Sequence, residues 1–385
     1  MKIALFTDTF PPQVNGVANV VKSSAEILVE KGHDVRVFTV SSGKASKGPS
    51  PEKFGLTRIF SMPFFGYPNE RFSLPLGWTL AKIKSFKPDI IHVHTPFAVG
   101  WEAVLSKKIL GIPLVGTHHT FFDHYLKHIY ADYGWAKKLS SKYVAAFYNR
   151  CDLVVSPTMT LADTLESYGV SRPMVVVPNS IDTDFFKPAA DKNEKEELKK
   201  QFGFSKNVLV YMGRVSYEKS IDVVIRAMSV IAGKSTDSTL VIIGGGPERE
   251  NLEILAKRIG VEKNVRFMGF LYGRELAAAL RASDVFVTAS KSENFPLSVI
   301  EAMASGLPVV AVSALGLSEM IENERSGFLV SPDKPEEIAD SVLKLFNNIL
   351  ILEKYSAKSR ELSLKYSKHN IARIHENNYE NLLIS

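Results

Sequence analysis

Two carboxylates in the second half of the chain, Glu293 and Glu301, stand where an α/β protein would bind a ligand. The apolar run 285–288 predicts a buried strand, and a helix of about three turns is predicted to begin at Phe295. Glu293 then lies between a strand end and a helix N-terminus, where parallel sheets bind ligands and unpaired N–H groups attract phosphate. Glu301 follows about two turns along the helix, so one ligand could contact both carboxylates. Two solvated glutamates are the alternative.

A pair of cations, Arg214 and Lys219, follows another predicted strand, 207–212, after Gly213. Two fixed cations stabilise a departing diphosphate, and an arginine can hold two phosphate oxygens at once. Gly245 lies in a glycine turn after the next predicted strand, where it can line a nucleotide. Taken one at a time, the two cations are also explained as surface charges and the glycines as a plain turn.

The N-terminal segment predicts the opening of a doubly wound domain. A strand over 2–7, a loop ending at Gly16, a helix over 17–32 and a strand over 34–40 follow one another. No G-x-G-x-x-G pattern follows the first strand, so dinucleotide binding is not indicated. Gly16 allows close backbone approach to a ligand, although a turn explains it equally well.

Histidines mark the ends of two later strands. His92 and His94 alternate with apolar residues, so they share one face of a predicted strand. His118 and His119 follow the next predicted strand, 112–117. A metal site would need more ligands close by, and the H-E-x-x-H pattern does not occur here. The sequence therefore predicts no metal site.

A predicted helix over 135–150 combines basic and aromatic side chains. Such a helix suits the surface of an anionic membrane, but it equally suits a core-packing helix with a basic outer face. The side chains concerned are Trp135, Lys137, Lys138, Lys142, Tyr143, Phe147, Tyr148 and Arg150.

Composition sets the outer limits. A chain of 385 residues is too long for one ordinary core, so two domains are expected. The apolar share of 45% and charged share of 23% are normal for a globular protein, and no run approaches a membrane span. The single cysteine, Cys151, excludes an internal disulfide, and no signal peptide opens the sequence, which favours the cytoplasm. The net charge of +6 suits an anionic surface or nucleotide phosphates but decides nothing alone.

Several motifs together resemble those of the retaining GT-B glycosyltransferases of family 4, which include sucrose synthase-like and phosphatidylinositol mannosyltransferase-like enzymes. Glu293 and Glu301 match the spacing of the family's Glu-x₇-Glu signature, and residues 213–219 match its Gly-Arg-x₃-Glu-Lys motif. Residues 117–120 resemble its Thr-x-His-Thr motif, and the loop at Gly16 resembles its Asn-Gly-Val loop. The resemblance extends over nearly the whole chain.

The resemblance implies roles for these residues. Glu293 and His119 would orient the donor sugar, and Glu301 would hold the ribose of the nucleotide. Arg214 and Lys219 would stabilise the leaving diphosphate. This chain has Glu-Asn-Phe-Pro where the family has Glu-Gly-Phe-Gly, which changes the backbone N–H groups that meet the phosphate. The implied donor-binding set is Gly16, Gly213, Arg214, Lys219, Gly245, Glu293, Asn294, Phe295, Pro296, Leu297 and Glu301.

The expected architecture is an α/β protein of GT-B fold, with two doubly wound, Rossmann-like domains facing across a cleft. Residues 1–178 would form the acceptor-side domain, with a C-terminal helix, 367–385, packed back on it. Residues 179–366 would bind the nucleotide sugar. The implied reaction is retaining, metal-independent transfer of a hexose from a UDP- or GDP-hexose, with no cofactor besides this donor.

The acceptor is inferred from the segment that follows His119, which resembles bacterial diacylglycerol glucosyltransferases and related lipid glycosyltransferases. This resemblance implies a lipid hydroxyl acceptor, diacylglycerol or a related glycolipid precursor, on the inner face of the cell membrane. A soluble sugar or phosphosugar acceptor, a non-catalytic sugar-nucleotide-binding protein and a dinucleotide oxidoreductase remain alternatives. No nucleic-acid partner is expected. The residues assigned to acceptor or membrane are Phe121, Tyr125, Lys137, Lys138 and Lys142.

Overall fold

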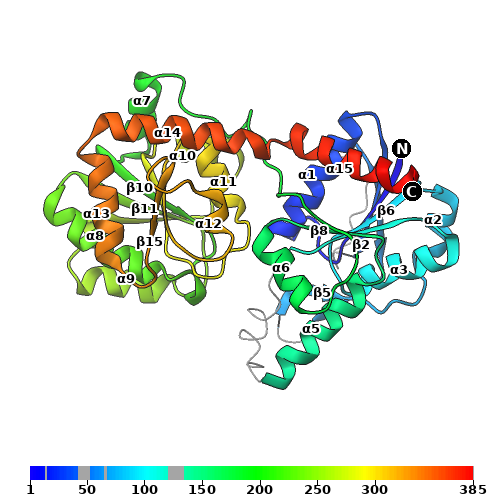
Figure 1. The fold of residues 1–385 in the computed structure, drawn as a ribbon. Coiled ribbons are helices and arrows are strands. Elements are labelled where there is room, and N and C mark those ends of the chain that lie inside the picture. The colour runs from blue at the N-terminus through cyan, green and yellow to red at the C-terminus, as the bar shows by residue number, and fades with distance from the viewer. Residues whose placement is uncertain (14, 42–52, 65–66, 120–133, 385) are drawn as a thin grey trace. The chain divides into compact units, whose positions relative to one another are not determined.

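The chain forms two compact units (Figure 1). The first unit contains Met1–Ser180 and Lys368–Ser385, and the second contains Ile181–Ser367. The sequence had placed the boundary after residue 178 and the returning tail from residue 367. The computed structural model describes residues 1–13, 15–41, 53–64, 67–119 and 134–384.

The first unit is built on a seven-stranded parallel sheet of order β3-β2-β1-β6-β7-β8-β9. Because helices cover both faces, its strands are almost continuous apolar runs rather than alternating ones. The strand order reverses between β1 and β6, where Phe6 lies opposite Val93. The strands are β1 (Lys2–Phe6), β2 (Asp34–Val40), β3 (Gly55–Ile59), β6 (Ile90–Val93), β7 (Leu114–Thr117), β8 (Leu153–Ser156) and β9 (Met174–Val176), with an antiparallel hairpin of β4 (Met62–Phe64) and β5 (Tyr67–Phe72).

Two helical layers cover this sheet. Residues of α2, α3, α5 and α6 form the core on one face, and residues of α1 and α15 form the core on the other. Ile371 and Tyr379 of α15 share that second core with Val21 and Leu28 of α1. The helices are α1 (Gly16–Glu30), α2 (Leu80–Phe86), α3 (Ala98–Leu110), α5 (Gly134–Tyr148), α6 (Met159–Ser167) and α15 (Lys368–Ile384).

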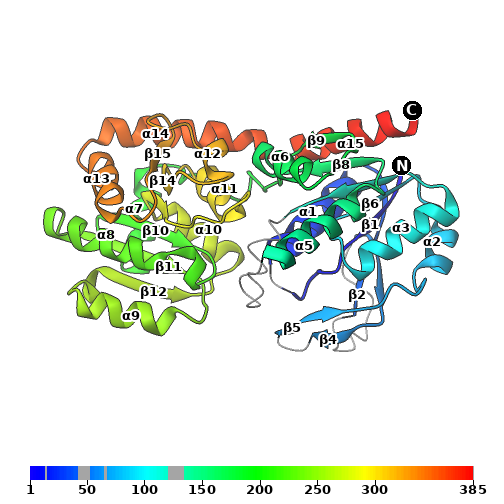
Figure 2. The same ribbon diagram turned by 60° about the horizontal axis from the view of Figure 1, so that its bottom comes forward.

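The second unit repeats the plan with a six-stranded parallel sheet of order β12-β11-β10-β13-β14-β15. Its strand order reverses between β10 and β13, where Leu209 pairs with Val285. Figure 2 shows the strands between helices on either side. The strands are β10 (Asn207–Met212), β11 (Ser238–Ile243), β12 (Val265–Gly269), β13 (Val285–Thr288), β14 (Val309–Val312) and β15 (Gly327–Val330).

The helices of the second unit also divide between two faces. α8, α9 and α13 contribute to one core, and α10, α11 and α12 contribute to the other. The helices are α7 (Lys192–Phe202), α8 (Ile221–Lys234), α9 (Arg249–Arg258), α10 (Gly273–Arg281), α11 (Leu297–Ala304), α12 (Leu317–Met320), α13 (Pro335–Phe346) and α14 (Ile349–Ser363), with 3₁₀ turns η1 (Tyr217–Lys219), η2 (Glu262–Asn264) and η3 (Leu364–Tyr366).

Two helices differ from the sequence-based expectation at their N-termini. The helix expected from Phe295 begins at Leu297, because Pro296 has an extended backbone, and it has eight residues rather than about three turns. Glu293 therefore lies in the loop before α11, and only Glu301 is helical. Gly16, expected in a loop, is the first residue of α1, whose N-cap Asn15 accepts the N–H of Ala18 at 2.9 Å.

Across the described ranges, no helix has both the length and the apolar character needed to cross a membrane.

Candidate active site

The second unit brings Lys219 and Glu293 together at the carboxyl ends of its strands. Lys219 follows β10 and Glu293 follows β13, and these neighbouring strands form the point where the sheet order reverses. Lys219 Nζ lies 2.6 Å from Glu293 Oε1, and the two side chains are 20% and 17% exposed. The pair is thus partly buried and still reachable from solvent. In open α/β sheets this is the place where ligands bind.

Arg214 is not part of this pair. Its side chain is exposed, and the described residues provide no ion pair between its guanidinium and Glu293. Its backbone is fixed, because its carbonyl accepts the hydroxyl of the buried Tyr211 at 2.9 Å. Arg214 therefore combines a hydrogen-bonded backbone with an exposed guanidinium, which is accessible to an anionic ligand.

The glycine turn after β11 packs backbone against backbone. Gly244 has φ of +129°, and a Cβ at this position would lie 1.9 Å from the carbonyl oxygen of Gly213. A Cβ on Gly245 would lie 2.6 Å from the ring of Phe270. These glycines therefore allow the loops after β10, β11 and β12 to approach closely.

Phe270 and Tyr272 form an exposed aromatic pair after β12. Their rings stack with centroids 6.1 Å apart and planes inclined by 12°, and they are 59% and 60% exposed. A flat, solvent-facing pair of this kind can stack on a planar ligand. Both residues were missed among the site residues expected from the sequence. The available signal was two aromatic residues, separated by Leu271, directly after a strand.

The loop before α11 turns most of its side chains inward. Phe295 is buried in the core and packs edge-on against Tyr366, with centroids 5.1 Å apart. Asn294 is also buried. The side chains of these two residues therefore hold the loop against the core. Helix α11 begins directly after the loop, with Pro296 as its N-cap and Leu297 as its first residue.

Glu301 lies on α11 with a partly buried side chain. Burial raises the pKa of its carboxyl to about 8. Within the described ranges, the side-chain oxygens of Glu301 have no hydrogen-bond or ion-pair partner. A carboxyl group with no internal donor is suited to bind hydroxyl groups of a ligand.

The first unit places His119 in a cluster of imidazoles. His119 Nε2 lies 3.1 Å from His94 Nδ1, and His92 stacks on His94 with ring centroids 4.2 Å apart. His92 Nδ1 lies 2.6 Å from the hydroxyl of Tyr379, and its Nε2 lies 2.6 Å from Thr117 Oγ1. The expectation that His92 and His94 lie on one face is consistent with this stacking. The C-terminal helix was expected to pack on this unit, but the contact of Tyr379 with His92 was not predicted from the sequence.

The imidazoles of this cluster are held neutral. Burial, followed by the neighbouring histidines, lowers the pKa values of His92 and His94 well below the usual range. Burial lowers the pKa of His119 to about 4, with a smaller opposing contribution from its hydrogen bond to Asn179. The cluster can therefore orient a ligand through hydrogen bonds but carries no charge at neutral pH.

Asp8, at the end of β1, is a further buried carboxyl near the reversal of strand order. It accepts the N–H of Val99 at 2.9 Å and the hydroxyl of Thr95 at 2.7 Å, so it caps α3. Burial raises its pKa to about 6 despite these bonds. Gly16, by contrast, has open space where a side chain would lie.

Helix α5 carries part of the expected interfacial surface. Trp135 and Leu139 are 69% and 61% exposed, and Lys138 and Lys142 are also exposed. Lys137 is only partly exposed. One apolar side of α5 packs on the sheet, as the alternative of a core-packing helix with a basic outer face predicts. The aromatic residues buried there are Phe147 and Tyr148. Phe121 and Tyr125, expected to contact the acceptor, lie outside the described residues.

The two doubly wound units define the fold class as GT-B. A solved structure of HepE from Anabaena in complex with UDP has a TM-score of 0.82 at 19% identity, covering 99% of this chain and 100% of that chain. Sucrose-phosphate synthase from Thermosynechococcus elongatus has a TM-score of 0.81 at 20% identity, covering 100% and 99%. The expected pair of Rossmann-like domains is confirmed.

Sequence comparisons identify the family. The model described as "Glycosyl transferases group 1" matches residues 194–362, and that described as "Glycosyltransferase Family 4" matches residues 14–185. The alpha-monoglucosyldiacylglycerol synthase of Streptococcus pneumoniae is 31% identical, covering 86% of this chain and 75% of that protein. Its counterpart from Acholeplasma laidlawii is 26% identical, covering 100% and 98%. A GDP-mannose-dependent alpha-mannosyltransferase of Mycolicibacterium smegmatis is 28% identical, covering 86% and 85%. The chain belongs to the family 4, group 1 glycosyltransferases.

Proposed function

We propose that the protein transfers a hexose from a nucleotide sugar to a lipid hydroxyl acceptor, diacylglycerol or a related glycolipid precursor, with retention of configuration and without a metal ion. The observation that carries the donor half of this proposal is the Lys219–Glu293 pair at the strand ends of the second unit. The acceptor half is supported by the relatives named as monoglucosyldiacylglycerol synthases.

Lys219 takes the place that a metal ion would have at the diphosphate. An ammonium group has three hydrogen-bond donors, and the contact with Glu293 uses one of them. The other two donate to phosphate oxygens as negative charge develops on the leaving group. The N-terminus of α11 adds its unpaired N–H groups, and Arg214 moves in from solvent as a second cation.

Glu293 both holds Lys219 in place and binds the sugar. Its Oε1 is bonded to Lys219 Nζ, so Oε2 accepts hydroxyl groups of the hexose. Glu301 binds the ribose, and the Phe270–Tyr272 pair stacks on the base. His119 contributes a neutral hydrogen-bonding group for the sugar.

Retention follows if the acceptor attacks from the same face that the leaving group occupies. The bond from the anomeric carbon to the phosphate oxygen breaks, and the bond to the acceptor oxygen forms on that face. The acceptor proton passes to the departing phosphate oxygen. Such a step uses no enzyme nucleophile, and its main requirement is charge stabilisation at the diphosphate, which the two cations supply.

Helix α5 is the part of the protein that we assign to the membrane. Exposed Trp135 and Leu139 lie on the same helix as exposed Lys138 and Lys142, a combination that binds the boundary between headgroups and acyl chains of anionic lipid. The protein would then be peripheral on the inner face of the cell membrane.

The decisive experiment measures nucleotide release from a panel of UDP- and GDP-sugars, with and without diacylglycerol in anionic mixed micelles. Lipid-stimulated release with one preferred donor supports the proposal and identifies the sugar. Release that is indifferent to lipid overturns the lipid acceptor and favours a soluble sugar or phosphosugar. Product stereochemistry, read by NMR, and activity in chelator test retention and independence from metal.

Vesicle flotation tests the membrane assignment separately. Replacing Trp135 and Leu139 by serine should reduce binding to anionic vesicles. A matched control replaces Ile349 and Leu350 of α14, which are 56% and 74% exposed on the second unit. Equal binding by the two double variants would contradict a role for α5.

A further inference from the structure

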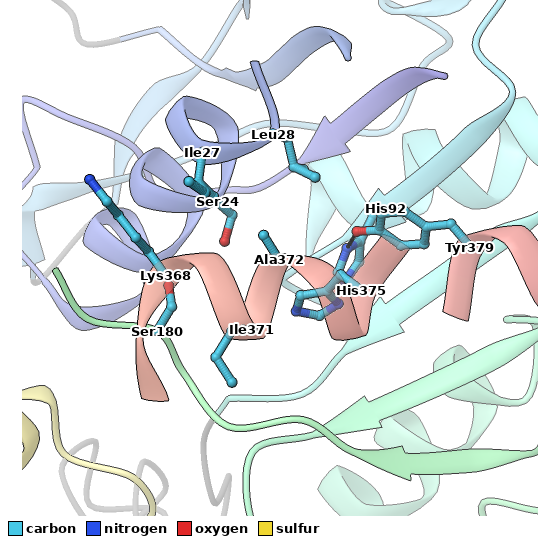
Figure 3. A pocket seen from close by; sticks show the side chains of 10 residues that line it. All are labelled: Ser24, Ile27, Leu28, His92, Ser180, Lys368, Ile371, Ala372, His375 and Tyr379. Atoms are coloured by element: carbon cyan, nitrogen blue, oxygen red, sulfur yellow. Dashed lines mark hydrogen bonds between the residues drawn. The ribbon is translucent and has the colours of Figure 1, made fainter. Parts of the chain in front are cut away.

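Four imidazoles gather beneath α15, of which His92 and His94 are buried and His119 and His375 partly buried, and we name them the histidine cluster. His92, His94 and His119 come from the ends of β6 and β7, and His375 comes from α15. The ring of His375 lies 5.4 Å from that of His92. Figure 3 shows His375 and Tyr379 reaching from α15 toward His92.

Hydrogen bonds satisfy some ring nitrogens of the cluster and leave two buried ones without a partner in the described part of the chain. Both nitrogens of His92 are used, by Tyr379 and Thr117. His94 Nδ1 is bonded to His119 Nε2, but His94 Nε2 is buried and has no partner in the described part of the chain. His375 Nδ1 is buried and unpartnered in the same way. Buried polar atoms of this kind carry a substantial penalty unless something bonds them.

His94 and His375, the two residues with these unpartnered nitrogens, line one small cavity. Its volume is about 10 Å³, which is enough for the centre of one water molecule. His119, Asn179 and Ser180 also line it, so its walls are polar on several sides. A water molecule there would find the two to four polar partners that a buried water needs.

We propose that one water molecule in this cavity donates to His94 Nε2 and His375 Nδ1, and thereby fixes which nitrogen of His119 carries the proton. A neutral imidazole has one N–H and one bare nitrogen. If the water donates to His94 Nε2, the proton of His94 is on Nδ1 and is donated to His119 Nε2. The proton of His119 is then on Nδ1.

The contact with Asn179 agrees with this assignment. The Asn179 side chain hydrogen-bonds His119, and its amide oxygen can accept the proton on Nδ1. With Nε2 accepting from His94 and the Nδ1–H donated to Asn179, both ring nitrogens hold His119 in one orientation. His94 and His375 are therefore positioning residues, which act on the sugar only through His119.

The water site and the tautomer are properties of the first unit, whereas their effect on transfer rests on the function proposed above for His119. The C-terminal helix thus has a chemical task besides covering the sheet. Its His375 sets the hydrogen-bonding direction of a residue that lies more than 250 positions earlier in the sequence.

Nitrogen-15 NMR of the imidazole rings in the full-length protein tests the tautomer directly. In the native protein, His119 should show a protonated Nδ1 and a bare Nε2. His375→Phe should replace this single state by a mixture of tautomers. His369→Phe, on the exposed side of the same helix, is the matched control and should leave the spectrum of His119 unchanged.

Two smaller substitutions keep the test decisive even if His375→Phe fails to fold. Asparagine places a polar atom near the position of Nδ1, whereas glutamine places one near Nε2. His375→Asn should therefore restore the native His119 tautomer, and His375→Gln should not. A His119 spectrum that is identical in the native, Asn and Gln proteins would overturn the proposal.

Activity measurements test the link to transfer. His375→Gln should lower kcat by about tenfold, the scale of one lost hydrogen bond, with the KM for donor little changed. Combined with His119→Ala, it should add no further loss, because both changes remove the same interaction. Additive losses would contradict the positioning role. If His119→Ala alone keeps full activity, the proposed function of His119 fails, while the NMR result still decides the water site.

Discussion

The two sites of the molecule manage charge in opposite ways. In the second unit, Lys219 and Glu293 keep opposite charges at partly exposed strand ends. In the first unit, the histidine cluster holds its rings buried and neutral, with the pKa values of His119 and His375 lowered to about 4. The charged site suits work on a leaving diphosphate, and the neutral one suits orientation by hydrogen bonds. The contrast extends to composition, because all nine histidines of the chain fall within the residues of the first unit.

Removing the cation of the charged site should have the largest effect. Lys219→Ala should lower kcat roughly a hundredfold to a thousandfold, because a fixed donor to developing negative charge is lost. Nucleotide release under saturating donor and acceptor measures it.

Lys291→Ala is the matched control for this change. Lys291 is another lysine beyond β13 that pairs with a carboxylate, Asp333, at 2.9 Å, but the two side chains are 47% and 62% exposed. Its loss should change kcat little. Similar losses in the two variants would mean that ion pairs at this end of the sheet act only on stability.

Acid should weaken the first unit selectively. A histidine whose pKa is lower in the folded than in the unfolded state contributes stability above its unfolded pKa and loses it as pH falls toward the folded pKa. Lowering the pH from 7 to 5 should therefore reduce the free energy of unfolding of the first unit by roughly 2–4 kcal/mol. Asp8 opposes this trend, because burial raises its pKa to about 6.

Tryptophan fluorescence in urea measures this change cleanly. The three tryptophans, Trp78, Trp101 and Trp135, all belong to the first unit. Hydrogen exchange of β10 and β11 follows the second unit, which has no histidine in its sequence. An equal loss in both units would refute the assignment to the histidine cluster.

Removing the hydroxyl that closes the histidine cluster should have a smaller effect. Tyr379→Phe leaves His92 Nδ1 buried without its partner at 2.6 Å, so the first unit should lose about 1–3 kcal/mol. Tyr211→Phe is the counterpart in the second unit, where the lost partner is the Arg214 carbonyl. Tryptophan fluorescence should detect the first change and not the second. Insensitivity of the first unit to Tyr379→Phe would show that the bond to α15 is not needed.

The smallest effect should come from Glu301, and its sign is opposite to that of the histidines. Its pKa is raised to about 8 in the folded state, so its contribution to stability is present at low pH and is lost as pH rises through 8. From pH 7 to 9 the free energy of unfolding of the second unit should fall by about 1 kcal/mol. Glu301→Gln should remove this slope, and Glu250→Gln, at an exposed position on α9, should keep it. Hydrogen exchange of the second unit without ligand provides the measurement.

The charged site could be located from the sequence because its residues follow strands directly. Lys219 and Glu293 come shortly after β10 and β13, and parallel strands put such residues at one edge. The sequence did not reveal which way each loop side chain turns. Phe295 is therefore in the core although it was itself expected to bind the donor. The exposure of Arg214 was not predicted either. The motif specifies where its backbone lies but does not specify where its guanidinium points.

The histidine cluster could be predicted only in part. Alternation along a strand places His92 and His94 on one face, and this follows from the period of two. His375 and Tyr379 reach them by the packing of a helix from the far end of the sequence, which no local pattern encodes. Likewise, basic and aromatic residues occur along the whole sequence of α5. Only the packing of this helix on the sheet determines that Phe147 is buried and Trp135 exposed.

The discontinuous first unit fixes an order of events during protein synthesis. The second unit is one continuous segment, and its two ends meet where the N–H of Ile181 bonds the carbonyl of Tyr366 at 2.9 Å. It therefore leaves the ribosome before α15 does. The first unit is translated earlier but completed later, because α15 leaves the ribosome only after the whole second unit. Synthesis thus completes the residues of the second unit before α15 can bring His375 and Tyr379 to the histidine cluster.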